Sequence, residues 1–160
     1  MSSVPILRIF VGGEPVAQPR GRTNRFGRPF IPKEHAIHGY KKAVIKAAKI
    51  AMTGRKRLEG PLTVGVLFVV GRTKEKSNPK FQNLPIWQPA RPDLDNFKKS
   101  TWDALKGVVW ADDSQVVQDD GMKIMAGSGA NLGAYIAIRA AGPAASELMI
   151  WKRSWGWPIA

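Results

Sequence analysis

All seven aspartates of the chain lie in one stretch, residues 93–120, which also holds three lysines and no arginine or glutamate. The whole chain, by contrast, carries 25 Lys and Arg against 12 Asp and Glu, a net charge of +13. Carboxylates gathered in this way repel one another unless cations relieve the repulsion. A basic protein with one acidic focus indicates a polyanionic partner and a local site that needs carboxylates.

The spacing of the first aspartates indicates how they could be brought together. Asp93 and Asp95 stand two residues apart and follow Pro92, which keeps the residue before it out of a helix. The segment 94–107 then predicts a helix, with a glycine at its end. Three polar side chains recur on one face of that helix, opposite an apolar face: Asp95, Lys99 and Asp103.

Asp112 and Asp113 follow this helix and can fold back onto its polar face. Three or four converging carboxylates, in a chain with no Cys and two His, suit an oxygen-preferring cation such as Mg²⁺ or Mn²⁺. Lys99, in the same cluster, can neutralise charge on a phosphate in the transition state. A basic protein that brings a phosphodiester to such a site has the layout of a metal-dependent nuclease.

Each of these acidic residues also has a purely structural explanation. Asp93 could be a helix N-cap, and Asp95 could form an ordinary surface ion pair with Lys99. Asp112 and Asp113 could be a turn. The aspartate cluster would then be structural, and the protein would be a non-catalytic nucleic-acid-binding module.

The elements that must position these residues follow the order β, α, β, α, β, β. Strands are predicted over 6–11, 62–70, 116–125 and 131–139, and helices over 34–52 and 94–107. We therefore expect an α+β domain in which the helices pack on one face of a small mixed sheet. The domain is expected to span residues 1–143, with 144–160 as a Trp-rich C-terminal extension. The segment 73–89, rich in Pro, Lys and Asn, is expected to be a connection.

The segment 18–32 predicts a loop, because glycines and prolines interrupt it throughout. It carries four arginines within nine residues: Arg20, Arg22, Arg25 and Arg28. Guanidinium groups match the oxygens of a phosphate, so this loop is the best candidate for a DNA contact. A solvated basic loop is the alternative.

Composition excludes several classes of protein. The absence of Cys excludes a disulfide scaffold, a cysteine nucleophile and a Cys-ligated zinc site. The longest nearly apolar run, 61–70, is far shorter than the roughly 20 residues of a membrane-spanning helix. The N-terminus has no charged start followed by an apolar core, so no signal peptide is expected. We expect an intracellular protein that does not act on a membrane.

The pattern Asp-x-Asp-Asn-x-x-Lys-x-x-x-Asp-Ala-Leu from Asp93, followed by Asp-Asp-x-Gln-Val-Val from Asp112, resembles the RusA-type Holliday-junction resolvases of bacteria and their phages. The resemblance implies a small α+β homodimer in the bacterial cytoplasm that nicks four-way DNA junctions symmetrically with Mg²⁺, or Mn²⁺ as a substitute. By position it implies metal ligands at Asp93, Asp95 and Asp113 and a catalytic lysine at Lys99. Other positions match with lesser roles: Asn96, Asp103 and Asp112 as supporting residues, and Lys123 as a phosphate contact.

Two features depart from the pattern of that family. Asp119 and Asp120 place acid where mixed or apolar strand residues are expected. The extension 144–160 contains Trp151, Trp155 and Trp157, which could stack on unpaired bases or fill a core edge or a subunit interface. These departures leave open a nuclease that prefers flaps or forks to junctions.

Overall fold

The computed structural model describes residues 7–72 and 84–154. The elements in chain order are β1 (Leu7–Gly12), β2 (Arg22–Thr23), β3 (Pro29–Phe30), α1 (Ile37–Ala51), β4 (Leu62–Val70), β5 (Ile86–Trp87), α2 (Leu94–Leu105), the short 3₁₀ helix η3 (Asp113–Gln115), β6 (Val116–Met125), β7 (Gly133–Ala140) and α3 (Ala144–Ser154). The predicted order of strands and helices is confirmed from β1 to β7, with β2, β3, β5 and η3 as short additional elements and α3 as an additional helix after β7.

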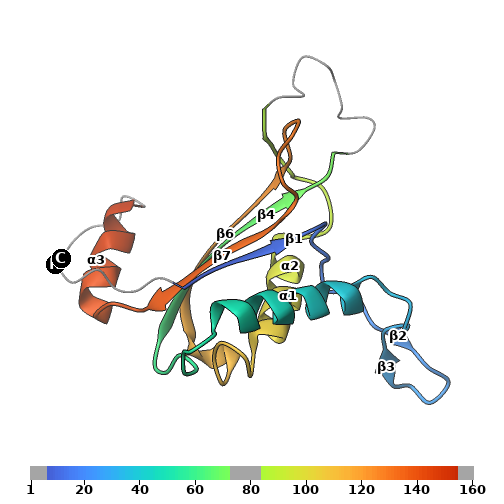
Figure 1. Ribbon diagram of the computed structural model, residues 1–160, viewed down its shortest axis with the longest axis horizontal. Coiled ribbons are helices and arrows are strands. Elements are labelled where there is room, and N and C mark those ends of the chain that lie inside the picture. Colours follow the sequence, from blue (N-terminus) through green and yellow to red (C-terminus); the bar gives the residue numbers. More distant parts are fainter. Residues whose placement is uncertain (1–6, 73–83, 155–160) are drawn as a thin grey trace.

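Five strands form one mixed sheet in the order β1-β7-β4-β6-β5 (Figure 1). β4 and β6 run parallel, and every other neighbouring pair in this sheet is antiparallel. A parallel pair needs a connection that crosses from one end of the sheet to the other, and α2 lies within that connection. β2 and β3 form a separate hairpin. The predicted single α+β domain with a small mixed sheet is confirmed.

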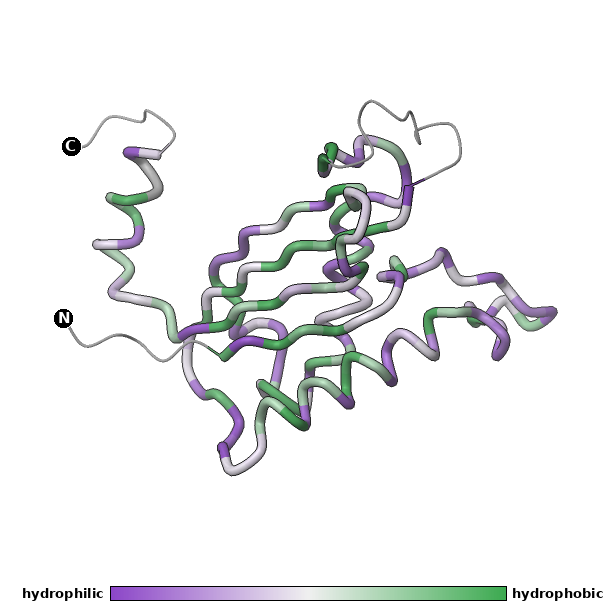
Figure 2. Tube along the Cα trace, turned by 45° about the horizontal axis from the view of Figure 1, so that its top comes forward, coloured by the Kyte–Doolittle hydropathy of each residue, from purple (hydrophilic) through white to green (hydrophobic). Residues whose placement is uncertain are grey.

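Both α1 and α2 cover the same face of this sheet (Figures 1 and 2). Burial alternates along β1, so Leu7, Ile9 and Val11 point into the core while the residues between them are exposed. The core continues into the helices, where the ring of Phe97 in α2 stacks on that of Phe68 in β4 with centroids 5.2 Å apart. The predicted packing of the helices on one face is confirmed.

A buried hydrogen bond of 2.8 Å joins α1 to α2, between the Tyr40 hydroxyl and Thr101 Oγ1. Burial raises the pKa of Tyr40 to about 12. Beside this bond α2 buries one face, which combines the apolar side chains of Phe97, Ala104 and Leu105 with the hydrogen-bonded hydroxyls of Ser100 and Thr101. The opposite face, which carries Asp95, Lys99 and Asp103, is therefore turned outward.

Several predicted boundaries differ from the structure by a few residues. The helix predicted over 34–52 spans Ile37–Ala51, because His35 Nδ1 accepts a hydrogen bond from the Ile37 N–H at 3.1 Å and holds a turn there. The strands predicted over 62–70 and 116–125 are confirmed to the residue. The segment predicted as a loop contains the β2–β3 hairpin, and β5 lies in the predicted connection, of which residues 73–83 fall outside the described part.

The helix α3 was not predicted, and it stands away from the sheet beyond the end of β7 (Figure 1). One ion pair of 3.0 Å fastens its first turn, between Arg139 of β7 and Glu147. The side chain of Trp151 and the residues Trp155 and Trp157 are outside the described structure, so their role stays a prediction. Within the described residues, no helix has the length and apolar character needed to cross a membrane.

Candidate nuclease site

The residue before α2, Asp93, is extended, with φ of −72° and ψ of 151°. Its side chain makes no capping hydrogen bond, although it occupies the N-cap position. The chain just before it is fastened by Lys123 of β6, whose ammonium donates to the carbonyl oxygens of Ala90 at 2.7 Å and Pro92 at 2.5 Å. Lys123 therefore stabilises the backbone before α2. The Asp93 carboxylate is exposed and makes no hydrogen bond that caps the helix.

A cavity of about 290 Å³ lies between the outward face of α2 and β6. Its lining contains the Trp102 ring, four carboxylates and two ammonium groups, which belong to Asp95, Asp103, Asp113, Asp119, Lys98 and Lys99. The chain after α2 thus folds back so that Asp113 borders the same space as Asp95 and Lys99. We call this space the carboxylate cavity; Asp93 is not part of its lining.

The expected metal ligands are only partly gathered. Within residues 7–72 and 84–154, no three His, Asp or Glu side chains lie close enough together to hold a metal ion. Asp95 and Asp113 nevertheless border one cavity, and Mg²⁺ is commonly held by one or two carboxylates together with phosphate oxygens and water. The donor set therefore fits an ion whose coordination is completed by the substrate.

The Asp113 carboxylate is held by a tryptophan that is fully buried. Trp110 Nε1 donates to Asp113 Oδ1 at 2.8 Å, and the Trp110 side chain has no exposed surface. This bond fixes one carboxylate oxygen, and Asp113 itself is half-buried at the start of η3. The core thereby sets the position of an acidic group at the edge of the carboxylate cavity.

Asp112 has a structural role, as its turn interpretation predicts. It caps η3, with Oδ1 accepting from the Ser114 N–H at 3.0 Å, while Gln115 Oε1 accepts from the Asp112 N–H at 3.2 Å. The ammonium of Lys106 lies 2.5 Å from its other oxygen. The Lys106 ammonium and the Ser114 N–H hold the pKa of Asp112 well below its usual range, and Asp112 raises the pKa of Lys106 in turn.

Two further carboxylates of the cavity are paired with lysines. Asp103 receives a hydrogen bond of 2.9 Å from Lys41 of α1. Asp119 of β6 receives one of 3.0 Å from Lys98 of α2, and this ion pair is partly exposed to solvent. Gly121, two residues further on the same face of β6, lies beneath this lysine: a Cβ there would collide with Lys98 Cε. The absence of a side chain at Gly121 is what lets Lys98 lie across β6.

Lys99 is exposed and forms no ion pair with any described residue. The surface pair that its spacing with Asp95 could have formed is not present. Besides the carboxylate cavity, Lys99 lines a second cavity, which Asn96 and Arg20 also line. The backbone carbonyl of Asn96 accepts a hydrogen bond of 2.8 Å from the Gln18 N–H, so the start of the arginine segment is tied to α2.

The β2–β3 hairpin projects beyond the helices (Figure 1). The four arginines of that segment lie on this hairpin or next to it. All four are exposed, and none is paired with a carboxylate of the described chain: Arg20, Arg22, Arg25 and Arg28. The hairpin turn is held by Asn24, whose Oδ1 accepts from the N–H groups of Phe26 and Arg28 at 2.9 Å each. The hairpin therefore presents unneutralised guanidinium groups beside α2.

Sequence reasoning gave no role in the site to three residues that contact or line the carboxylate cavity or its ligands: Lys98, Trp110 and Asp119. Trp110 had no signal apart from its place three residues before Asp113. Lys98 lies one position before the expected lysine, and Asp119 could be linked to it only through the packing of α2 against β6. The contact of Lys98 with Asp119 depends on the tertiary arrangement and not on spacing along the chain, whereas Trp110 reaches Asp113 within one turn of the chain.

The family model described as "Endodeoxyribonuclease RusA" matches residues 12–139, which contain every residue of the carboxylate cavity. The chain is also similar to a protein of Bacillus subtilis (strain 168) named "Uncharacterized protein YqaN", with 29% identity over an alignment 116 residues long, which covers 69% of this chain and 82% of the relative. The family match spans most of the chain and agrees with the expected motif around α2. The chain is a member of the RusA family of endodeoxyribonucleases.

Proposed function

We propose that this protein is a Mg²⁺-dependent endonuclease that resolves four-way DNA junctions by paired symmetric nicks. One observation carries the proposal: Asp95, Lys99 and Asp113 border a single cavity, and four arginines on the neighbouring hairpin or next to it form no ion pair with a described carboxylate. The arginines supply contacts to DNA phosphates, and the cavity supplies carboxylates and an ammonium group for hydrolysis. The proposal places the protein with the DNA of a bacterial cytoplasm, and Mn²⁺ is expected to replace Mg²⁺.

Asp95 and Asp113 would hold the cation, with Asp93 as a third ligand from the exposed, extended residue before α2. When bound, the cation polarises the scissile phosphate and lowers the pKa of a coordinated water. Trp110 donates to Oδ1 of Asp113, and no described residue hydrogen-bonds to its other oxygen, which we expect to bind the cation. Lys99, which forms no ion pair with a carboxylate of the described residues, stabilises the charge that develops on the phosphate.

We further propose that two copies of the chain act together and that α3 contributes to their contact. α3 has 11 residues, and an isolated helix of fewer than about 12–15 residues is marginally stable in water. Leu148 and Ile150 are 53% and 60% exposed, so α3 has apolar surface that the described residues do not cover. The domain division at residue 143 is part of this proposal, because the family match ends at residue 139. Leu148→Glu with Ile150→Glu should yield monomers by light scattering.

A non-catalytic nucleic-acid-binding module is the second candidate, and a specific observation favours it. Three aspartates of the cluster form ion pairs with lysines: Asp103, Asp112 and Asp119. Such pairing is what a purely structural role of the cluster would require. A nuclease that prefers flaps or forks shares the chemistry of the first proposal, and it differs only in its substrate.

The deciding experiment is cleavage of a labelled four-way junction, compared with matched linear duplex, flap and fork, with Mg²⁺ or with EDTA. We expect paired nicks on the junction that need Mg²⁺ and that Asp113→Asn abolishes while junction binding persists. Asp120→Asn is the matched control, because Asp120 is an exposed acid outside the lining of the carboxylate cavity. Binding without cleavage would favour the module, and preferred cleavage of flaps or forks would replace the substrate.

A further inference from the structure

We propose that the second cavity bordered by Lys99 receives one unstacked DNA base next to the phosphate that is cut. We call this space the hairpin cavity. The inference rests on the proposed function, and it adds a subsite that reads the base itself, whereas the arginines contact the backbone.

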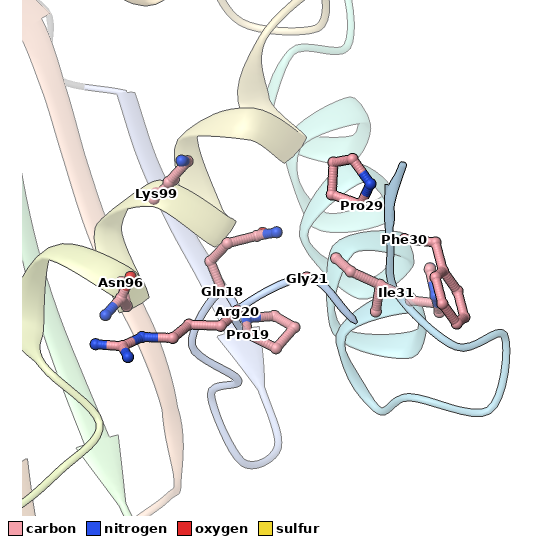
Figure 3. A pocket seen from close by; sticks show the side chains of 10 residues that line it. Gln18, Pro19, Arg20, Gly21, Pro29, Phe30, Ile31, Asn96 and Lys99 are labelled. Atoms are coloured by element: carbon pink, nitrogen blue, oxygen red, sulfur yellow. The ribbon is translucent and has the colours of Figure 1, made fainter. Parts of the chain in front are cut away.

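The hairpin cavity has a volume of about 720 Å³ and lies between the base of the β2–β3 hairpin and the first turns of α2 (Figure 3). Its walls come from the segment after β1, from the hairpin, from α1 and from α2. The lining residues are Gln18, Pro19, Arg20, Gly21, Pro29, Phe30, Ile31, His38, Asn96 and Lys99. None of them is acidic, so the cavity is suited to part of a polyanion and not to a cation.

The lining combines an aromatic ring with amide groups, as sites for nucleotide bases do. Phe30 is 45% exposed at the wall of the cavity, so its ring is available to another planar group. Bases of any identity can stack on an aromatic side chain, because every base has a π-face. Figure 3 shows the Gln18 and Asn96 side chains on the side nearer α2, with Phe30 across from them.

The Gln18 amide is held in place but not satisfied. Its backbone N–H donates to the Asn96 carbonyl, which fixes the residue against α2. The side-chain Oε1 is buried and accepts no hydrogen bond from the described residues. A buried acceptor without a partner costs free energy, and a glutamine amide can pair with the edge of a base through both its donor and its acceptor. A base in this cavity therefore supplies a partner that none of the described residues provides.

Lys99 sets the position of the base relative to the reaction. The same side chain lines the hairpin cavity and the carboxylate cavity, where Asp95 and Asp113 lie. A nucleotide whose phosphate faces Lys99 in one cavity can place its base in the other. Bases at a branch point are more easily unstacked than bases within a duplex, so a junction supplies such a base at low cost.

The test compares four-way junctions that are intact with junctions in which each nucleotide flanking the cut is made abasic in turn. For the wild-type protein we expect one abasic position to lower kcat/KM about tenfold, consistent with the loss of one stacked base. Phe30→Leu should lose a similar factor on the intact junction and lose nothing further on the abasic one. Phe10→Leu is the matched control, because Phe10 is 46% exposed on the opposite face of the sheet and should keep the abasic effect.

Gln18→Leu should make cleavage less dependent on which of the four bases stands at that position, a change that a merely structural role would not produce. The proposal is overturned if no abasic position affects the wild-type protein, or if Phe30→Leu lowers cleavage of intact and abasic junctions equally. In that case the cavity holds backbone phosphate only. Failure of the wild-type protein to cut any junction would refute the proposed function instead. The base site would then be judged by 2-aminopurine fluorescence in a bound junction with Ca²⁺: a change in the wild-type protein that Phe30→Leu removes would support it, and no change would overturn it.

Discussion

The hydrogen bond from Trp110 to Asp113 should couple the stability of the core to the acidic site. The donor, Trp110 Nε1, belongs to a side chain with no exposed surface, and it lies 2.8 Å from Oδ1 of the half-buried Asp113. Hydrogen bonds to charged groups contribute about 1.5–3 kcal/mol, and partial exposure of the acceptor places this one at the lower end. We therefore expect a coupling of about 1.5 kcal/mol between the two side chains.

The coupling is measured with a double-mutant cycle of Trp110→Phe, Asp113→Ala and the double variant, using urea unfolding. Trp110→Phe alone should cost about 2–4 kcal/mol, because it removes the donor and also leaves a void in the core. The free-energy cost of the void is present both in Trp110→Phe and in the double variant, so it cancels when the coupling energy is calculated. Unchanged m-values across the four proteins show that the unfolded states are comparable.

DNA cleavage assays should also distinguish Asp113→Ala from Trp110→Phe. Asp113→Ala removes a proposed metal ligand and should abolish cleavage at any Mg²⁺ concentration. Trp110→Phe keeps the carboxylate but frees it, so cleavage should persist with a higher Mg²⁺ requirement. A coupling below about 0.3 kcal/mol, which is within the scatter of additivity for independent sites, would refute the view that Trp110 positions Asp113.

Three further predictions follow from the contacts around the site. Gly121→Ala should displace Lys98 and break its ion pair with Asp119. Because this pair is partly exposed, the free energy of unfolding should change by less than about 1 kcal/mol. Lys98→Met, added to Gly121→Ala, should then have no further effect on stability. Asp112 has a lowered pKa, so its contribution to stability is present above the usual aspartate pKa of about 4 and is lost as pH falls below it. The stability of Asp112→Ala, followed by thermal unfolding, should therefore be below that of wild type at pH 7 and converge with it in acid. Arg22→Gln should weaken duplex and junction binding alike and reduce the salt dependence of log K by about one charge, as measured by a titration at several salt concentrations.

Each of these predictions has an outcome that would contradict it. A full additive loss from Lys98→Met in the Gly121→Ala background would mean that Lys98 finds Asp119 by another path. A constant difference between wild type and Asp112→Ala down to low pH would mean that Lys106 does not act through the charge of that carboxylate. An unchanged salt dependence for Arg22→Gln would place the hairpin away from DNA.

The main strands were predictable because local pattern and tertiary role agree in them. The segments 62–70 and 116–125 have turn signals at their ends, and the structure confirms both to the residue. β5 has two residues, and it exists only because Ile86 and Trp87 pair with the end of β6. α3 has no clear apolar stripe to bury, so nothing in its sequence separated it from an irregular tail.

The candidate site was predictable to the extent that it lies on one helix. The spacing of Asp95, Lys99 and Asp103 placed them on one face, which the structure confirms. The partnership of Lys98 with Asp119 depends on how α2 packs against β6, and spacing along the chain says nothing about that. The roles assigned to these residues in metal binding and catalysis remain predictions.

The place of β7 in the sheet has a consequence for the order in which the chain can become active. β7 is the last strand to be synthesised, and it lies between β1, the first, and β4. Until residues 133–140 have left the ribosome, β1 has no partner in this sheet and the β4–β6 pair is unsupported on one side. Pairing of segments so distant in the chain is slow, because the intervening chain must first be ordered. Nuclease activity should therefore appear only after translation has passed β7, and nascent chains that stop short of it should be inactive and open to proteases.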